Sequence, residues 1–233
     1  MKRFVRWWTH LSHSSRTYYE SRRWVMRMCR AALAWLCGYD ANRVNEFGDG
    51  FRALCLQVMR DRRVLDVGCG LGEHGDEVIT FGSARRYFGL DRSPGLVTSA
   101  HAAHPAHAFC VGDGVAIPFR QGGVDVVSTS FTLHHIDPAA REVVMREMLR
   151  VAERHVIIRD LFGFNPGLRE RLYRLYYTIV DGSYYRFSLD QWRAFFDRCG
   201  ARIECEIHSP ERELTHRLCA FVLVRRSVEP SGD

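Results

Sequence analysis

Short apolar runs rich in β-branched residues alternate with amphipathic stretches from residue 63 onward, a pattern typical of parallel strands joined by helices. Five of these runs predict strands, which cover residues 64–67, 86–90, 107–111, 124–128 and 155–158. Between the last two, apolar residues at helical spacing follow Pro138 and predict a crossover helix. The alternation predicts an α/β fold with a mostly parallel sheet and helices on both of its faces.

The C-terminal part of the chain departs from this alternation. Ser188 and Gln191 have the spacing of a capping box, which predicts that a helix opens there and stops at Gly200. Two apolar strands, at 201–207 and 218–224, then follow with only a short link between them. Such a link suits a hairpin better than a parallel crossover, so one of these strands should run antiparallel.

Composition and charge narrow the class of protein. The 233 residues are 46% hydrophobic and 26% charged, which fits one folded domain with an appendage. The net charge is +6, but the first 36 residues hold eight basic residues and one acid, while the rest of the chain holds 25 and 26. A basic footprint for nucleic acid is therefore not expected. None of the eight cysteines forms a C-x-x-C pair, which favours free thiols in the reducing cytoplasm.

Residues 64–72, Val-Leu-Asp-Val-Gly-Cys-Gly-Leu-Gly, predict a strand that runs into a glycine-rich turn and then a helix. Glycines allow backbone N–H groups to approach a ligand closely. Their spacing also fits a dinucleotide-binding pattern, so the glycines alone do not identify the cofactor. Asp66 would repel a pyrophosphate and suits a cofactor that carries an ammonium and a sulfonium. Asp91 ends the second strand, where a carboxylate can accept both ribose hydroxyls, and Asp113 follows the third strand, where it can accept from the adenine amine.

These motifs together resemble the class I S-adenosylmethionine-dependent methyltransferases, especially the small-molecule group that includes ubiquinone and menaquinone methyltransferase-like enzymes. The resemblance covers roughly residues 63–225. Its motifs are residues 64–72, 89–93, 112–119, 124–128 and 133–136. It implies a Rossmann-like, seven-stranded, mostly parallel sheet with a C-terminal antiparallel hairpin. It also implies S-adenosylmethionine as the cofactor, S-adenosylhomocysteine as the product, and no metal.

The cofactor-binding residues expected from these motifs lie in the glycine turn and at the strand ends, apart from one tyrosine near the N-terminus. They are Asp66, Gly68, Cys69, Gly70, Gly72, Asp91, Arg92, Gly112, Asp113, Gly114, Ser130 and Tyr19. Arg92 departs from the family pattern, in which many members carry an aliphatic residue against the adenine. Its apolar stem could still cover the ring.

His134 and His135 follow the fourth strand, at the turn that borders the methyl-transfer centre in the resembling family. We predict both as catalytic, because a histidine there could take a proton from a hydroxyl nucleophile. One of them could instead cap the next helix or be buried. Asp160 ends the fifth strand and should face the same crevice, where we predict that it binds substrate. The alternative is a turn-forming acid before Gly163.

Two segments, 1–36 and 162–196, are rich in aromatic residues. In related methyltransferases the N-terminal helices and the insertion after the fifth strand cover the active site. This predicts an N-terminal helical cap at 1–62, a methyltransferase domain at 63–226 with a lid insertion at 161–187, and a flexible tail at 227–233. The tyrosines expected to bind substrate are Tyr176, Tyr177, Tyr184 and Tyr185. The aromatics could instead fill a helical core, and the Arg-rich N-terminal helix could lie on an acidic membrane or serve as a targeting segment.

The predicted function is methyl transfer to a small aromatic or lipophilic molecule by a monomer or homodimer, with O-methylation favoured. A nicotinamide oxidoreductase would account only for the glycines and Asp91. A nucleic-acid methyltransferase is possible by fold, but residues 128–131 replace the Asn/Asp-Pro-Pro-aromatic motif of exocyclic-amine enzymes. A nucleic-acid or protein methyltransferase on the same fold is the alternative, and a non-catalytic binding partner is disfavoured because the cofactor residues are intact. The histidines between residues 101 and 107 predict a solvated loop and no metal site, because Pro105 disrupts the helix that would align them.

Overall fold

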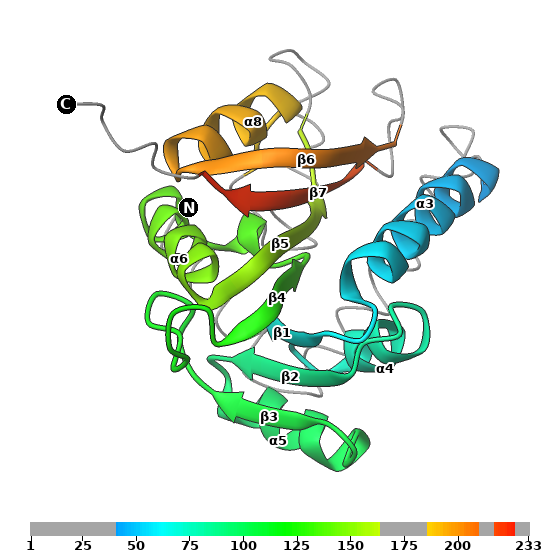
Figure 1. Ribbon diagram of the computed structural model, residues 1–233, viewed down its shortest axis with the longest axis vertical. Helices are drawn as coiled ribbons and strands as arrows, with labels where there is room; N and C mark the ends of the chain where they lie inside the picture. Colours follow the sequence, from blue (N-terminus) through cyan, green and yellow to red (C-terminus); the bar gives the residue numbers. More distant parts are fainter. Residues whose placement is uncertain (1–40, 164–185, 210–216, 227–233) are drawn as a thin grey trace, which may run out of the picture.

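The strands predicted from the sequence all lie in one sheet of the computed structural model, which describes residues 41–163, 186–209 and 217–226 (Figure 1). The strands are β1 (Arg63–Val67), β2 (Arg86–Asp91), β3 (Ala108–Val111), β4 (Val124–Ser130), β5 (Ala152–Leu161), β6 (Ala201–His208) and β7 (Leu218–Arg225). The helices are α3 (Ala41–Met59), α4 (Glu73–Thr80), α5 (Pro94–Ala103), α6 (Pro138–Val151) and α8 (Leu189–Arg198), with a 3₁₀ helix η1 (Leu133–His135).

The seven strands follow the order β3-β2-β1-β4-β5-β7-β6. β1 to β5 pair in parallel, whereas β7 is antiparallel to both β5 and β6. The predicted fold class is therefore confirmed, including the hairpin at the C-terminal end and the single reversed strand. The helix predicted after Pro138 is α6, which crosses from β4 to β5.

Helices cover both faces of the sheet. Successive residues of a strand point to opposite faces, so neighbouring apolar residues pack against different helices. Leu65 and Val127 pack in a core with α6 and α8. Their neighbours Val64 and Val126 pack in a second core with α3 and α4. Figure 1 shows these two helical layers on either side of the central strands, with α5 beside β3.

The helix α8 forms as its sequence predicts. The Ser188 side chain accepts from the Gln191 backbone N–H, and the Gln191 side chain accepts from the Ser188 N–H. Gly200 follows the helix with a φ of 79°, a conformation that favours glycine. Trp192 is fully buried on α8 and stacks against Phe196, so this helix anchors the β6–β7 end of the sheet.

The helix α3 belongs to the core of the sheet domain. Phe51, Leu54 and Met59 are buried on α3 and pack in the same cluster as Val126 and Ile157 of the sheet. The described part of the predicted N-terminal cap is therefore continuous with the domain that was expected to begin at residue 63. Removing α3 would expose apolar residues of the central strands.

An ion pair joins the beginnings of β1 and β4. The Arg63 backbone N–H and its Nε both donate to Asp125 Oδ2, at 2.8 and 3.0 Å, and its NH2 donates to Oδ1 at 3.3 Å. These hydrogen bonds from Arg63 lower the pKa of the Asp125 carboxyl to about 2. The pair fixes the register of the two strands at the edge opposite to the strand carboxyl ends.

Candidate functional site

The carboxyl ends of the five parallel strands lie along one edge of the sheet. β1 lies between β2 and β4, so the order of the strands along the chain reverses at this point. In open α/β sheets, ligands bind outside the strand ends at such a switch point. Asp66, Asp91, Asp113 and Asp160 all lie in or just after the last residues of β1, β2, β3 and β5, as predicted from the sequence. This edge is therefore the candidate site.

A glycine turn connects β1 to α4 at the centre of this edge. Gly68, Gly70 and Gly72 have φ values of 78°, 56° and 78°, which favour glycine. A Cβ on Gly68 would lie 2.4 Å from the Thr132 side chain, so the turn packs tightly against the segment after β4. A Cβ on Gly70 would meet nothing within 4 Å. The turn is thus closed on its inner side and open at Gly70.

Asp91 ties the glycine turn to the end of β2. Its Oδ2 accepts from the Gly70 backbone N–H at 2.9 Å, and its Oδ1 accepts from the Ser93 N–H at 2.9 Å. Burial raises the pKa of the Asp91 carboxyl, although these backbone donors oppose the shift. Each carboxylate oxygen can accept a further hydrogen bond. Asp91 is therefore held in place beside the open part of the turn with acceptor capacity left.

Asp66 and Cys69 lie deeper than the sequence predicts. Asp66 is 1% exposed, its Oδ2 accepts from the Tyr87 hydroxyl at 2.8 Å, and burial raises the pKa of its carboxyl. The Tyr87 hydroxyl is therefore the partner of Asp66 in this structure, and contact between Asp66 and the cofactor's charged groups stays a prediction. The Cys69 thiol lies beneath Gly89, and the Cys69 N–H donates to the carbonyl of Leu90. Both residues shape the turn from inside and offer a ligand very little surface.

The end of β3 carries the residues predicted to meet the adenine. Asp113 is exposed, and its Oδ1 accepts from the Val115 backbone N–H at 3.1 Å in a local turn. A Cβ on Gly112 would lie 2.6 Å from the Leu90 side chain, and one on Gly114 would lie 3.2 Å from Val144. Arg92 is exposed after β2. These residues therefore lie on the β2–β3 side of the glycine turn.

His134 and Asp160 form a buried pair at the ends of β4 and β5. The Nδ1 atom of His134 is hydrogen-bonded to the Asp160 carboxylate, which also accepts from the His134 backbone N–H at 3.3 Å and from the Leu161 N–H at 2.7 Å. The exposed fractions are 2% for His134 and 0% for Asp160. Sequence reasoning placed both residues in one crevice but did not foresee their pairing, which assigns Asp160 to His134 in place of direct substrate contact.

His135 lies beside this pair. Its ring centroid is 4.1 Å from that of His134, with an angle of 43° between the rings, and the residue is half-buried. When Nδ1 of His134 carries the proton that Asp160 accepts, Nε2 is the basic atom of that ring. The arrangement can therefore hold and accept a proton at the turn after β4.

A second charged cluster at this edge centres on Arg159 and was not predicted. Arg159 lies on β5 next to Asp160 and so points to the opposite face of the sheet, toward α3 and α4. Its guanidinium contacts Glu77 and His74 of α4 and Ser130 of β4. The hydrogen bond from His74 is the main cause that lowers the pKa of the Glu77 carboxyl to about 2, and Arg159 adds to it. Strand alternation was the one sequence signal that could have placed Arg159 here.

The histidines before β3 have internal partners. His104 Nδ1 lies 3.0 Å from Asp76 Oδ2, and His107 Nε2 lies 3.1 Å from Asp76 Oδ1. The His107 ring also packs against Tyr87 and Phe109. The prediction of a solvated loop is therefore wrong for these two residues. Within the described ranges, no three His, Cys, Asp or Glu side chains form a group that could hold a metal ion.

Several predicted site residues lie outside the described residues. They are Tyr19, Tyr176, Tyr177, Tyr184 and Tyr185. The predicted tail and most of the cap and lid insertion lie there as well. None of the helices in the part of the chain that the structure describes is long and apolar enough to cross a membrane.

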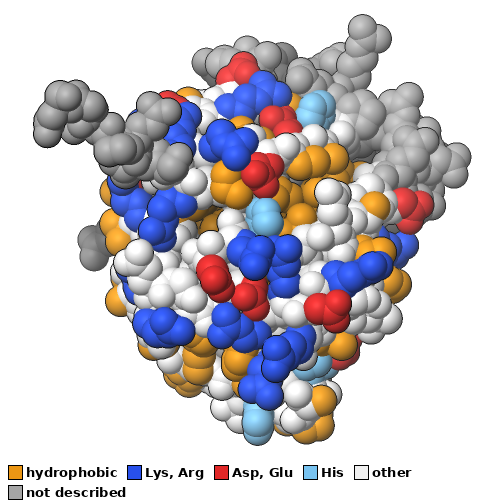
Figure 2. All heavy atoms as spheres, viewed as in Figure 1, with side chains coloured by type: hydrophobic (Ala, Val, Ile, Leu, Met, Phe, Trp, Pro, Cys, Tyr) orange, Lys and Arg blue, Asp and Glu red, His pale blue; other side chains and the backbone are white. Residues whose placement is uncertain are grey.

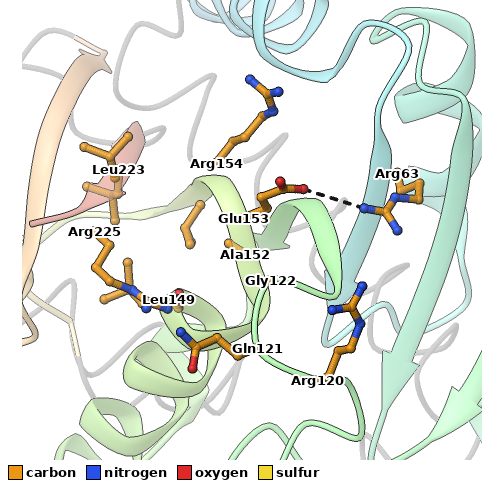
Figure 3. A pocket seen from close by; sticks show the side chains of 12 residues that line it. Arg63, Arg120, Gln121, Gly122, Leu149, Ala152, Glu153, Arg154, Leu223 and Arg225 are labelled. Atoms are coloured by element: carbon orange, nitrogen blue, oxygen red, sulfur yellow. Dashed lines mark hydrogen bonds and ion pairs between the residues drawn. The ribbon is translucent and has the colours of Figure 1, made fainter. Parts of the chain in front are cut away.

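A cavity of about 500 Å³ lies at the opposite edge of the sheet, at the beginnings of β1 and β5 (Figure 3). Arg63, Arg120, Arg154 and Arg225 line it together with Glu153, which lies 3.8 Å from Arg63. It contains none of the predicted site residues. The strand carboxyl ends therefore remain the candidate site.

Comparisons with known proteins agree with this location. Residues 64–155, which run from β1 to the first residues of β5, match the family model described as a methyltransferase domain. A demethylmenaquinone methyltransferase from Beutenbergia cavernae is 35% identical over 89 residues, which are 38% of this chain and 35% of that protein. An ajmaline N-methyltransferase from Rauvolfia serpentina is 31% identical over 137 residues, which are 52% of this chain and 44% of that protein. The chain spans less than half the length of each.

The fold is shared with a solved structure of magnesium protoporphyrin IX methyltransferase from Synechocystis PCC 6803 with bound SAH. The TM-score is 0.59 and the identity is 16%, and the match covers 76% of this chain and 81% of that one. At this identity the likeness shows the fold alone. The glycine turn, Asp91, Asp113 and both histidines lie inside the matched domain, whereas Arg159 and Asp160 follow it.

Proposed function

We propose that this chain, which belongs to the class I S-adenosylmethionine-dependent methyltransferases, transfers a methyl group from S-adenosylmethionine to a small-molecule acceptor whose favoured nucleophile is a hydroxyl oxygen. The observation that carries the proposal is the glycine turn after β1, which is tied to Asp91 at the switch point of the sheet. The family assignment gives the class of reaction. The finer statements about the acceptor rest on the residues around the turn.

The glycine turn and Asp91 fit the proposed cofactor. A side chain on Gly70 would occupy the open space above the turn, which backbone atoms leave free for a ligand. The Asp91 carboxylate suits two neighbouring ribose hydroxyls, because both are donors and both oxygens can accept again. Asp113 and Arg92 then lie on the adenine side. When bound, S-adenosylmethionine supplies an electrophilic methyl carbon on a positively charged sulfur.

The His134–Asp160 pair suits an acceptor that must lose a proton. Asp160 orients the ring of His134, and in this proposal the Nε2 atom takes a hydroxyl proton while oxygen attacks the methyl carbon. Alignment of the two reacting groups can supply about 7–11 kcal/mol of the rate enhancement. The His135 ring centroid lies 4.1 Å from that of His134, so His135 is the second candidate for the base. In this mechanism Asp160 is a positioning residue, and one of the histidines is catalytic.

The names of the relatives support a small acceptor. They refer to demethylmenaquinone, ajmaline and magnesium protoporphyrin IX, which are all small organic molecules. On the one face that Figure 2 shows, arginines and acidic side chains of the described residues are interspersed. The turn after β4, Ser130-Phe-Thr-Leu133, also differs from the motif of exocyclic-amine enzymes.

Methyl-labelled S-adenosylmethionine tests this proposal. The full chain is incubated with the label and, separately, with a lipid-rich small-molecule extract, with protein and with nucleic acid. We expect label in the organic extract, and a sample heated beforehand is the control. Label that enters only the protein or the nucleic-acid sample would contradict the small-molecule acceptor while keeping the methyltransferase assignment.

A further inference from the structure

We propose that Arg159, together with Ser130, binds the carboxylate at the amino-acid end of the cofactor. This inference rests on the proposed function and adds a subsite to it. Ser130 was expected from the motifs to bind the cofactor, with no part of the cofactor specified, whereas Arg159 was not expected at the site. The argument depends on where the guanidinium lies, which of its sides are covered, and how fully its present partners occupy it.

The position of Arg159 follows from the order of the strands. The proposed ribose and adenine partners, Asp91 and Asp113, lie at the ends of β2 and β3 on one side of the glycine turn. A cofactor that lies across the turn must then extend its other end toward β4 and β5. Ser130 and Arg159 are partners in register at the ends of these two strands. Thr132 bonds to the carbonyl of Gly68 at 3.3 Å, which links this region directly to the turn.

Two aromatic rings restrict how a ligand can approach the guanidinium. The Phe51 ring centroid lies 4.4 Å from the Arg159 Cζ atom, and the Phe131 centroid lies 5.2 Å from it. The Arg159 side chain is 11% exposed. Because the rings cover much of the planar group, its N–H edges remain as the route for a ligand. A carboxylate matches these edges, since its two oxygens can take two parallel hydrogen bonds.

Each guanidinium nitrogen of Arg159 already has a partner, so the proposed carboxylate would share these nitrogens with the present partners. The guanidinium nitrogens lie 3.2 and 3.5 Å from the Glu77 carboxylate oxygens, longer than the ~2.7–2.9 Å typical of a charge-assisted pair. Nε donates to Ser130 Oγ at 3.3 Å, and NH2 lies 2.6 Å from His74 Nδ1. Glu77 therefore keeps the arginine in place through long contacts, and a second carboxylate can share the guanidinium.

The backbone at Phe131 supports a functional role for this corner. Phe131 has a φ of 53°, a left-handed conformation that is strained for a bulky residue. Its N–H donates to the carbonyl of Arg159 at 2.8 Å, which fixes the ring beside the guanidinium. The Phe131 side chain also stays 36% exposed. Such strain persists where the surrounding structure requires it, and here it holds one wall of the proposed subsite.

Calorimetry with two ligands tests the proposal. S-adenosylhomocysteine carries the carboxylate, whereas 5′-methylthioadenosine has the same nucleoside and sulfur without the amino-acid end. We expect Arg159→Met to weaken S-adenosylhomocysteine binding roughly 10- to 100-fold, the loss of a charged hydrogen-bonded pair. Binding of 5′-methylthioadenosine should change by less than about threefold. Arg193→Met is the matched control, since Arg193 also contacts two carboxylates, Asp190 and Glu206, but lies on α8.

A second variant separates ligand binding from a structural role. Glu77→Gln removes the resident negative charge beside Arg159, so S-adenosylhomocysteine should bind at least about threefold more tightly while 5′-methylthioadenosine is unaffected. If Arg159 and Glu77 only brace α4, both variants should weaken both ligands equally, which would overturn the proposal. An unchanged affinity of Arg159→Met for S-adenosylhomocysteine would overturn it as well. If the wild-type chain bound neither ligand, the proposed function itself would fail.

Discussion

Replacing His134 by alanine should lower kcat by roughly 10²- to 10⁴-fold, the usual cost of removing a general base. Cofactor affinity should stay within about threefold of wild type, because the ring lies after β4 and the glycine turn does not bond to it. Two quantities are measured: turnover with the acceptor that is labelled by methyl-labelled S-adenosylmethionine, and the affinity for S-adenosylhomocysteine by calorimetry. His135→Ala provides the comparison, since that ring lies next to the pair.

Asp160→Asn tests whether the carboxylate acts through His134. The amide cannot hold the Nδ1 proton as a carboxylate does, so kcat should fall by about the same order as in His134→Ala. The double variant should be no slower than either single variant. When two groups act as a unit, removing one already abolishes the contribution of both, so removing the second costs nothing more. Turnover at the wild-type rate in both histidine variants would falsify the hypothesis that a histidine is the general base. It would indicate an acceptor that arrives already ionised.

Replacing Asp91 by alanine should weaken S-adenosylhomocysteine binding by about 2–4 kcal/mol, since two ribose hydroxyls lose a charged acceptor. The structure adds a second cause, because the Gly70 N–H loses its partner and the turn is less well held. Calorimetry measures the change, and a thermal melt shows whether the fold is retained.

Asp113→Ala is the control for Asp91. It removes an exposed carboxylate at the neighbouring strand end, which is expected to accept one hydrogen bond from the adenine. The loss of S-adenosylhomocysteine affinity should therefore be clearly smaller than in Asp91→Ala. An Asp91 variant with the wild-type dissociation constant would show that the end of β2 does not bind the ribose. The glycine turn would then have to hold the cofactor without it.

The fold was predictable from the sequence because its signals are local. Each strand is a short apolar run, and the Ser188–Gln191 capping box marks the start of the helix α8. The motifs at successive strand ends also predicted a methyltransferase, and residues 64–155 match the family model described as a methyltransferase domain. Parallel strands bring their carboxyl ends to one edge, so a correct strand assignment places most of the candidate site.

The details that the sequence did not reveal all depend on contacts between distant segments. The His134–Asp160 pair requires the register of β4 against β5, and the Arg159 cluster joins that strand to α3 and α4. Asp66 looked like a ligand because it is an acid at a strand end, but the Tyr87 hydroxyl meets it from inside. Residue type and spacing carry no information about which side of a turn a buried side chain occupies.

Calorimetry of the wild-type chain with S-adenosylhomocysteine and with NAD is the most direct test of the account. Both ligands contain an adenine and a ribose, but only NAD carries a pyrophosphate, and only S-adenosylhomocysteine has an amino-acid end to reach β4 and β5. The account predicts saturable binding of S-adenosylhomocysteine at one site per chain and no detectable binding of NAD. Binding of NAD in the absence of S-adenosylhomocysteine binding would contradict it.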